Sequence, residues 1–445
     1  MAGTSSGAGK TTVACGLIGA LRARGLVVQG FKVGPDYIDP SHHALAAGRP
    51  ARNLDAFLSG PELIAPLVRH GGAGADVAVI EGVMGMFDGA SGREELASTA
   101  HVARLLDAPV LLVVDASAMA RSAAAVVHGF ASFDPDVAVA GVVFNQVGSD
   151  HHEELLRDAV APLGLPVIGA LRRDERLRTP ERHLGLVPAP EREELAREAL
   201  GLLADAVARQ CDLDAVLALA RGAPARPGPA WSPDPGVSAP RSARIAIARG
   251  PAFSFHYEEN LELLRAAGGE LVDVDPLRDE ALPPGTDALV LAGGFPEVYG
   301  EELSANEPLR ARVAAFAAAG RPILAECGGL LYLAAELDGR AMCGVLPLRG
   351  KMAGRLTLGY REAVAASATP WLAAGEEVRG HEFHYSTVEP RPGGELSAPA
   401  WRLSVRGRER ADGCAFGALQ AGYLHLHWAA HPTIAGRFVR AALRV

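Results

Sequence analysis

Short apolar runs alternate with alanine-rich segments along the first half of the chain. The runs at 27–33, 76–80, 109–114, 137–144 and 166–171 are rich in β-branched residues and predict strands. The segments between them, such as 96–106 and 151–161, predict helices. This alternation is typical of an α/β domain with a mostly parallel, doubly wound sheet covered by helices on both faces.

The second half starts with the same pattern and then changes. Strands are expected at 244–248, 270–274, 288–291 and 322–325, and helices at 257–267 and 309–319. The last part, 351–410, has more β character and its strand order is not evident. The second half therefore also predicts an α/β domain, with an added β region.

A proline-rich segment separates the halves. Residues 222–242 contain six prolines, which disfavour a helix and indicate an extended linker. We therefore expect a first domain over 1–221, a linker over 222–242 and a second domain over 243–445.

Composition excludes several classes of protein. The formal net charge of −9 argues against nucleic-acid or anionic-membrane binding, and no apolar stretch reaches the length of a membrane span. The five cysteines are widely spaced and lack a C-x-x-C pair, which favours a reduced, cytoplasmic protein. The oligomeric state, a homodimer included, stays open.

Lysine is scarce: 40 arginines accompany only Lys10, Lys32 and Lys351. A lysine retained against this bias is expected to have a chemical task, because its compact ammonium reaches a phosphate oxygen differently from a planar guanidinium.

A glycine-rich segment at 3–12 has the residues of a phosphate-binding loop. Backbone N–H groups around Gly7 and Gly9 would surround phosphate oxygens, and Lys10 would contact the β- and γ-phosphates. Thr11 would bind Mg²⁺, and Thr12 would also contribute to the ATP site. A glycine-rich turn before an ordinary helix is the alternative. Only Met1 and Ala2 precede the loop, so we expect the central strand of the sheet to be missing from this sequence and ATP binding to suffer.

The early glycine in Gly-Thr-x-x-x-x-Gly-Lys-Thr resembles dethiobiotin synthetase and its relatives, which use ATP to activate a carboxylate. Lys32, Asp36 and Glu81 follow the ends of predicted strands, where ligands bind in such sheets. Lys32 would stabilise the transferred phosphoryl group, while Asp36 and Glu81 would hold Mg²⁺. A helix cap or a surface charge is the alternative for either carboxylate. The resemblance also implies an adenine contact for Asn145.

Cys327 stands in Ala-Glu-Cys-Gly-Gly, which reads as strand, tight turn and helix. Such a turn is expected to expose the thiol near a helix N-terminus and to lower its pKa. A buried structural cysteine is the alternative, and we expect that role for Cys15, Cys211, Cys343 and Cys414. The N–H groups of Gly294, Phe295 and Gly328 would form an oxyanion hole, with His425 or His427 as the base.

These segments resemble a class I glutamine amidotransferase domain, and its Tyr-Leu-His pattern favours His425 over His427. In much of that class an acid lies two residues after the histidine, where this chain has His427. A zinc site of His381, His384, His425 and His427 is a rival interpretation, although no metal-binding motif is complete.

The pairing of the two domains resembles the cobyrinic and hydrogenobyrinic acid a,c-diamide synthase family. The motifs lie at 3–12, 32–40, 81–89, 182–186 and 325–329. The resemblance implies glutamine hydrolysis at Cys327 through a thioester. ATP with Mg²⁺ then phosphorylates the a and c acetate groups of cobyrinic or hydrogenobyrinic acid, and ammonia displaces the phosphate. Asp36, Tyr37, Asp39, Glu81 and Asp88 match the family's corrinoid positions.

Other functions stay open at this point. Nickel-sirohydrochlorin diamide synthase and cobyric acid synthase share the chemistry, and the 35–39 segment favours a,c-diamidation over the latter. A non-catalytic ATPase switch with a degenerate amidotransferase domain is a third possibility. The presence of cobalt in the substrate is not determined.

Overall fold

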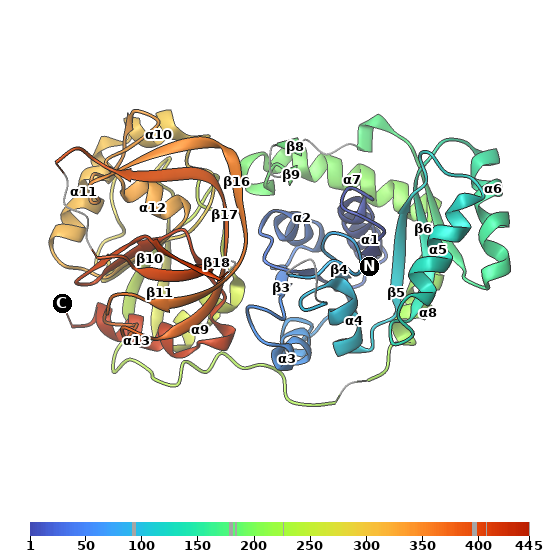
Figure 1. Ribbon diagram of the computed structural model, residues 1–445, viewed down its shortest axis with the longest axis horizontal. Helices are drawn as coiled ribbons and strands as arrows, with labels where there is room; N and C mark the ends of the chain where they lie inside the picture. Colours follow the sequence, from blue (N-terminus) through green and yellow to red (C-terminus); the bar gives the residue numbers. More distant parts are fainter. Residues whose placement is uncertain are drawn as a thin grey trace. The chain divides into compact units, whose positions relative to one another are not determined.

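The computed structural model describes residues 1–90, 95–177, 181–182, 185–225, 227–393, 398–405 and 407–444. The chain divides into two compact units, Met1–Ser232 and Pro233–Val445. Figure 1 shows the elements of each unit. The division falls inside the proline-rich segment 222–242, which carries no helix or strand of its own between α8 (Leu213–Arg221) and β10 (Ala243–Ala248) in the part that the structure describes.

A parallel sheet forms the centre of the first unit. One ladder has the order β3-β2-β4 and the other β1-β5-β6-β7. The strands are β1 (Ala2–Gly3), β2 (Val28–Val33), β3 (Arg52–Leu54), β4 (Val77–Glu81), β5 (Val110–Asp115), β6 (Val139–Val147) and β7 (Val167–Arg172). Every pairing in these two ladders is parallel. A small antiparallel hairpin, β8 (Glu181–Arg182) and β9 (Gly185–Leu186), lies apart from them.

The expectation that the central strand is missing is wrong. Ala2 and Gly3 pair in parallel with Leu112 and Val113 of β5. On the other side of β1, the N–H of Gly82 donates to the carbonyl of Met1 at 2.8 Å. The strand is only two residues long, but hydrogen bonds to β5 on one side and to the end of β4 on the other hold it in place. The two ladders therefore meet at the glycine-rich loop that follows β1.

Helices cover both faces of this sheet, as predicted. Along β5, Leu111 and Val113 pack in a core with α1 (Lys10–Ala23), α2 (Ile38–Ala47) and α7 (Glu193–Gln210). Leu112 and Val114 point to the opposite face and pack in a second core with α4 (Thr99–Leu106), α5 (Ser122–Ser132) and α6 (Asp150–Val160). Since successive strand residues face opposite sides, the near-continuous apolar runs follow from burial on both faces. Of the other two helices, α3 (Pro61–Gly71) contacts α4 and β3, and α8 contacts β7.

The second unit contains a six-stranded sheet in the order β11-β10-β12-β13-β21-β20. Its strands are β10, β11 (Gly269–Val274), β12 (Ala288–Leu291), β13 (Ile323–Glu326), β20 (Cys414–Phe416) and β21 (Leu419–Gly422). All pairings are parallel except that of β20 with β21. The helices are α9 (Glu258–Ala266), α10 (Gly300–Ala305), α11 (Glu307–Ala318), α12 (Gly328–Leu333) and α13 (Thr433–Ala442).

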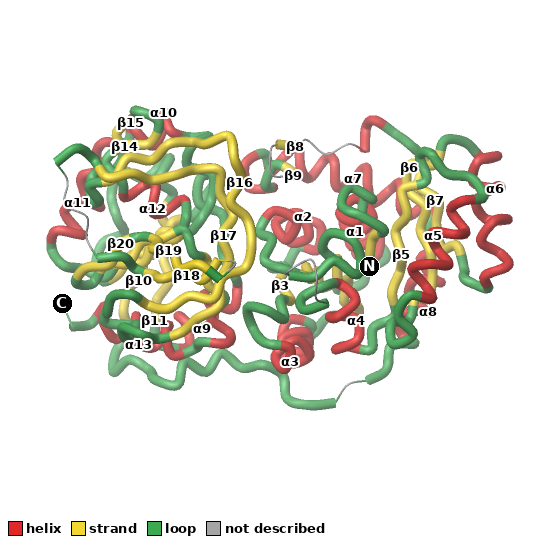
Figure 2. The backbone as a smooth tube through the Cα atoms, in the orientation of Figure 1, coloured by secondary structure: helices red, strands yellow, loops and turns green. Residues whose placement is uncertain are grey.

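A second, largely antiparallel sheet accounts for the β character of 351–410. Figure 2 shows its two long strands, β16 (Leu348–Ala365) and β17 (Glu377–Pro390). The two pair with each other, and β17 also pairs with the short β22 (His425–Leu426). The sheet is completed by β14 (Glu336–Leu337), β15 (Arg340–Ala341), β18 (Trp401–Val405) and β19 (Arg408–Asp412). Through β22 it reaches the segment that follows β21 of the first sheet.

Among the described residues, no helix combines the length and the apolar character that crossing a membrane requires.

Candidate active site

The glycine-rich loop that is predicted to bind phosphate, called the phosphate loop below, connects β1 to α1 and has the backbone that its glycines predict. Gly7 and Gly9 adopt φ angles of 78° and 92° in the left-handed region. A Cβ on Gly9 would lie 1.9 Å from Nδ2 of Asn145, so only glycine fits there. The same amide donates to the carbonyl of Ala8 at 3.2 Å and holds the loop in place. The adenine contact of Asn145 stays a prediction.

The early glycine has a packing reason. A Cβ on Gly3 would lie 2.9 to 3.1 Å from the side chain of Lys10. The buried Lys10 therefore crosses directly over Gly3, and its Nζ donates to the carbonyls of Ser5 (3.0 Å) and Met84 (2.6 Å). Burial, followed by the nearby Lys32, lowers the pKa of Lys10.

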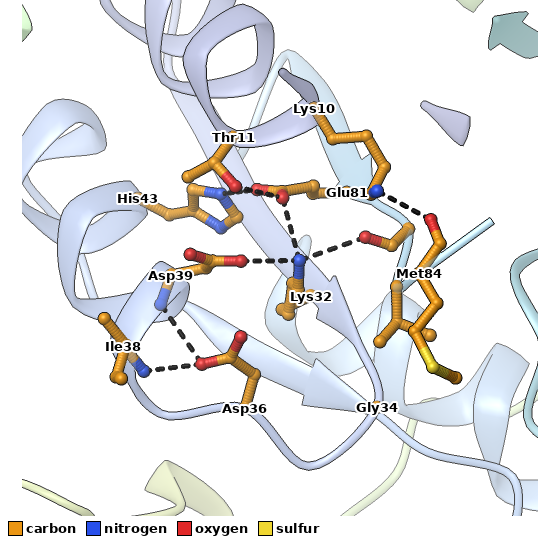
Figure 3. Close-up of polar contacts among 12 residues, drawn as sticks. Lys10, Thr11, Lys32, Gly34, Asp36, Ile38, Asp39, His43, Glu81 and Met84 are labelled. Carbon is orange, nitrogen blue, oxygen red and sulfur yellow. Dashed lines mark hydrogen bonds and ion pairs between the residues drawn. The ribbon is translucent and has the colours of Figure 1, made fainter. Parts of the chain in front are cut away.

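Glu81, at the end of β4, contacts three other side chains of the site, and Figure 3 shows these partners. Its Oε1 accepts hydrogen bonds from Thr11 Oγ1 at 2.6 Å and Lys32 Nζ at 2.8 Å. Its Oε2 lies 2.6 Å from His43 Nε2. Lys32 also pairs with Asp39 at 2.6 Å. The carboxylate, the ammonium and the imidazole are all buried.

The charges of Glu81 and Lys32 stabilise one another. Burial alone would raise the pKa of Glu81, but Lys32 and His43 hold it well below its ordinary value. Burial likewise opposes the charge of Lys32, whereas Asp39 and Glu81 hold its pKa above the ordinary value. Both groups are therefore ionised at neutral pH, as a buried pair must be to offset desolvation.

The other predicted substrate and metal residues lie in two turns nearby. Oδ1 of Asp36 accepts from the N–H groups of Ile38 (2.7 Å) and Asp39 (3.2 Å) and so caps the start of α2. Burial, and next the charge of Asp39, raises the pKa of Asp36 to about 7. Tyr37 is buried at the N-terminus of the same helix. Oδ2 of Asp88 accepts from Gly85 N–H at 2.9 Å, in the turn after β4.

The donor atoms of this site suit Mg²⁺. A hydroxyl and a carboxylate from two elements lie 2.6 Å apart at the first turn of α1, and Mg²⁺ prefers oxygen ligands. Thr11 and Glu81 supply oxygen atoms of this kind, and their part in metal binding stays a prediction. The oxygen Oδ1 of Asp36 already serves the two backbone N–H groups of α2, so its part in metal binding stays a prediction.

The structure brings Cys327 to a strained turn between β13 and α12. Its φ and ψ are 48° and −98°, and its N–H donates to the carbonyl of Gly422 at 2.7 Å. The expectation of an exposed thiol with a lowered pKa is wrong. Cys327 is only 4% exposed, and burial, followed by the charge of Glu297, raises its pKa. The thiol lies 3.9 Å from the carbonyl of Phe383 in β17.

The predicted oxyanion-hole residues lie next to this turn. A Cβ on Gly328 would lie 3.1 Å from the backbone nitrogen of Gly294. The two N–H groups therefore come from chain segments in close contact, at the ends of β13 and β12. Phe295 is buried, and its ring packs edge-on against Phe255 at 5.2 Å between centroids.

His425 begins the short strand β22, and its side chain lies near the residue that precedes Cys327. Its Nδ1 is 3.7 Å from the carboxylate of Glu326, the residue immediately before Cys327. His427 instead faces Glu259, with 3.4 Å between Nε2 and Oε2. The choice of His425 over His427 stays a prediction.

The histidines proposed as a zinc site do not point toward one centre. The rings of His381 and His425 are stacked at 4.9 Å with 13° between their planes. In the described part of the chain, no group of three or more His, Cys, Asp or Glu side chains has an arrangement that could hold a metal ion.

Two residues near these sites escaped the sequence analysis: His43 and Glu326. His43 follows Asp39 by four residues, so predicting a helix over this segment would have placed both side chains on one face. The contacts of Glu326 and His381 join strands far apart in sequence and carry no local signal. Within the 182–186 motif, residues 183 and 184 lie outside the described residues.

Comparisons with known proteins identify a domain in each half of the chain. The family model "CobQ/CobB/MinD/ParA nucleotide binding domain" matches residues 1–187, and "CobB/CobQ-like glutamine amidotransferase domain" matches 244–433. The chain is 53% identical to "Hydrogenobyrinate a,c-diamide synthase" of Streptomyces coelicolor, over 99% of this chain and 96% of that protein.

Two further relatives extend this picture. A protein of the same name from Thermobifida fusca is 50% identical over 98% of this chain and 95% of its own length. "Cobyrinate a,c-diamide synthase" of Syntrophotalea carbinolica is 47% identical over 99% and 97%. The chain therefore belongs to the hydrogenobyrinate and cobyrinate a,c-diamide synthase family of ligases.

Proposed function

We propose that this chain converts the a and c acetate groups of a corrinoid acid into amides, using ATP and glutamine, in cobalamin biosynthesis. The observation that carries the proposal is the joining of Thr11, Lys32 and Glu81 at the end of the phosphate loop. A second unit of the same chain holds a cysteine beside two candidate oxyanion donors. One site suits phosphoryl transfer, and the other suits release of ammonia from glutamine.

In the first unit a substrate carboxylate attacks the γ-phosphorus of ATP, and ADP leaves. Lys10 and Lys32 stabilise the negative charge of the transferred phosphoryl group, while Thr11 and Glu81 hold Mg²⁺. When bound, the ion neutralises phosphate charge and orients the phosphates. Ammonia then attacks the acyl phosphate carbon and phosphate leaves, so each amide consumes one ATP and one glutamine.

In the second unit Cys327 attacks the side-chain amide of glutamine. Because burial raises the pKa of this thiol, it stays protonated until a base takes the proton, and we assign that task to His425. The N–H groups of Gly294, Phe295 and Gly328 stabilise the oxyanion. His425 returns the proton to the departing ammonia, and water then hydrolyses the thioester.

The cobalt-free acid is the preferred substrate in this proposal. Relatives named for hydrogenobyrinate are 50% to 53% identical to this chain. Those named for cobyrinate are 43% to 47% identical. We therefore expect hydrogenobyrinic acid to be converted more efficiently than cobyrinic acid.

A competition assay tests the proposal. The protein is incubated with glutamine, Mg-ATP and equal amounts of the two acids, and products are followed by mass spectrometry. Two successive losses of about one mass unit are expected, first in the cobalt-free acid, because each step replaces OH by NH₂. Absence of amide from both acids would reject the substrate assignment, and amidation of another tetrapyrrole would redirect it.

The nucleophile is tested separately with Cys327→Ser. This variant should lose glutamine-dependent amidation by at least about 10³-fold, as expected for removal of a covalent nucleophile. With ammonium chloride as nitrogen source it should match the parent chain. Retained glutamine hydrolysis would mean that Cys327 is not the nucleophile.

A further inference from the structure

Within the second unit, His425 belongs to a series of buried side chains that contact one another. His381 of β17 lies directly opposite His425 of β22 in the antiparallel ladder. Residues opposite each other in such a pair point to the same face, and the two rings stack at 4.9 Å with 13° between their planes. At most 1% of either side chain is exposed.

A second segment also packs closely against the His425 ring. A Cβ on Gly293, which follows β12, would lie 2.4 Å from Cε1 of His425. The imidazole is thus in contact with both the backbone of Gly293 and the ring of His381. Glu326 lies 3.7 Å from Nδ1, which is longer than a hydrogen bond, so this carboxylate attracts an imidazolium without fixing the plane of the ring.

His381 is itself anchored. The hydroxyl of Tyr257, just before α9, lies 2.9 Å from His381 Nε2. The Tyr257 ring packs against His427 at 4.7 Å between centroids, and His427 faces Glu259. This chain of contacts ties the orientation of His381 to two other segments of the unit, the start of α9 and the residues at β22.

The same strand also touches the nucleophile. The carbonyl of Phe383 lies 3.9 Å from Sγ of Cys327. Within three consecutive residues, β17 therefore contacts the thiol through its backbone and the base through a ring. Such a strand can fix the relative placement of two groups that come from β13 and β22.

The charge state of His381 suits this task. The groups around it are His425 and His427 at β22, Tyr257 before α9 and Arg361 in β16. Burial, followed by the neighbouring His425 and Arg361, holds the pKa of His381 well below its ordinary value. It therefore adds no second positive charge when His425 takes a proton.

We propose that His381 is the positioning residue of the glutaminase site: its ring stacks on that of His425 and holds it in the orientation that accepts the proton of Cys327. The inference rests on the proposed glutaminase function and assigns to this residue the orienting task that a third group performs beside other Cys–His pairs.

The test compares His381→Ala with His381→Phe in the full chain. Alanine removes the stacked ring, and a misplaced base should lower kcat for glutamine hydrolysis by about 100-fold. The KM for glutamine should change less than about threefold, since substrate contacts are untouched. Phenylalanine keeps a flat ring and should restore kcat to within about fivefold of the parent.

Two further readouts separate positioning from damage to the fold. Alkylation of Cys327 by iodoacetamide at pH 7 should slow about tenfold in His381→Ala, because the base no longer assists thiolate formation, and recover in His381→Phe. Amidation with ammonium chloride should stay within about twofold of the parent in both variants, as the phosphate site lies in the other unit.

Two results would overturn the proposal: an unchanged kcat in His381→Ala, or a loss in His381→Phe as large as in His381→Ala, which would assign the effect to a ring nitrogen. Failure of the glutaminase assignment itself would be recognised differently. In that case Cys327→Ser would still hydrolyse glutamine, whatever the His381 variants do.

Discussion

At the scale of single residues, the rare asparagines hold loops in place. In each case a side-chain amide bonds to backbone groups of a loop or helix end, and none faces only solvent. The bonds join Asn53 to Gly34 and Asp36, Asn145 to Ala8, Asn260 to Leu426 and Trp428, and Asn306 to Pro276, Asp279 and Leu309. Three of the four support the phosphate loop, the Asp36 turn or the His425 strand.

The lysines divide into two buried and one exposed. Lys10 and Lys32 are buried among backbone carbonyls and carboxylates of the phosphate site. Lys351 instead pairs with Glu389 at 2.6 Å, with both side chains more than half exposed. Such a surface pair is worth little, so scarcity alone did not indicate which lysines have a chemical task.

The contact between Gly9 and Asn145 yields a residue-scale prediction. Gly9→Ala should abolish ATP binding, because its methyl would lie 1.9 Å from the Asn145 amide and displace the loop. Gly25→Ala, beyond the C-terminus of α1, is a matched control: its φ is also positive, but a Cβ there meets nothing within 4 Å. It should cost only about 1 kcal/mol and retain binding. Isothermal titration with Mg-ATP makes the comparison, and equal affinity in both variants would refute the steric argument.

At the scale of elements, the close approach of β17 and β22 decides the geometry of the second site. Gly380 makes this approach feasible, since a Cβ there would lie 2.6 Å from the carbonyl of His425. The glycine before His381 is thus required for the two strands to pack. The segment that the sequence suggests as a histidine cluster is the part of β17 that pairs with β22.

Gly380→Ala should therefore separate the two strands and lower glutamine hydrolysis by about 100-fold. Gly354→Ala, in β16 with open space around its Cβ, should change the rate less than twofold. Steady-state glutaminase assays distinguish them. Comparable rates for the two variants would show that the strand spacing tolerates a methyl group.

A buried carboxylate at the end of β19 predicts a pH dependence of stability. Oδ2 of Asp412 accepts from the N–H groups of Tyr423 (2.9 Å) and Leu424 (3.3 Å), just before His425. Burial, followed by the charge of Glu382, raises the pKa of Asp412 from 3.8 to about 6. The folded state then binds this proton more tightly than the unfolded state, so the contribution of Asp412 is full below about pH 4 and is lost as pH rises through 6.

Asp412→Asn removes this titration. Above pH 6 the variant should equal or exceed the parent in free energy of unfolding, by up to about 3 kcal/mol, and this advantage should shrink toward pH 4. Urea denaturation between pH 4 and 8 measures the difference. The exposed Asp136→Asn serves as control and should follow the parent. A difference that grows toward pH 4 would contradict the predicted sign.

At the scale of the whole molecule, the chain combines two sites with separate chemistry in two compact units. The first has a doubly wound parallel sheet whose helices cover both faces, and the ends of β1, β2 and β4 hold the phosphate site. The second combines a parallel sheet with an antiparallel one, and its candidate residues come from β12, β13, β17 and β22. A change that inactivates one site should therefore leave the activity of the other site intact.

Metal removal and a lysine variant test this independence. EDTA, or Lys10→Met, should reduce amidation with either glutamine or ammonium to background, because phosphoryl transfer requires charge neutralisation. Glutamine hydrolysis without ATP should persist in both cases. Lys351→Met, at an exposed ion pair, is the matched control and should amidate normally. Loss of glutamine hydrolysis under EDTA would contradict the separation.

Much of the fold was predictable because its signals are local. Runs of β-branched residues located β2, β4 to β7 and β10 to β13 within one to three residues at each end, and the proline-rich segment contains the division between units. The strand β1 was missed because two residues carry no periodicity, and its existence depends on hydrogen bonds to chain on either side. The order of β16 to β19 was missed because β18 pairs with β16 and not with β17, its neighbour in sequence, and such a pairing leaves no local pattern.

By itself, the sequence determined the chemistry available: a phosphate loop with its lysine and threonine, carboxylates at strand ends, and a cysteine between a strand and two glycines. Tertiary structure decided the state of those groups. It buried Cys327, so that its pKa rises although a helix N-terminus follows it, because desolvation outweighs the helix dipole. It also placed His43 on Glu81 and His381 on His425, since contacts between distant segments form only when the sheets assemble.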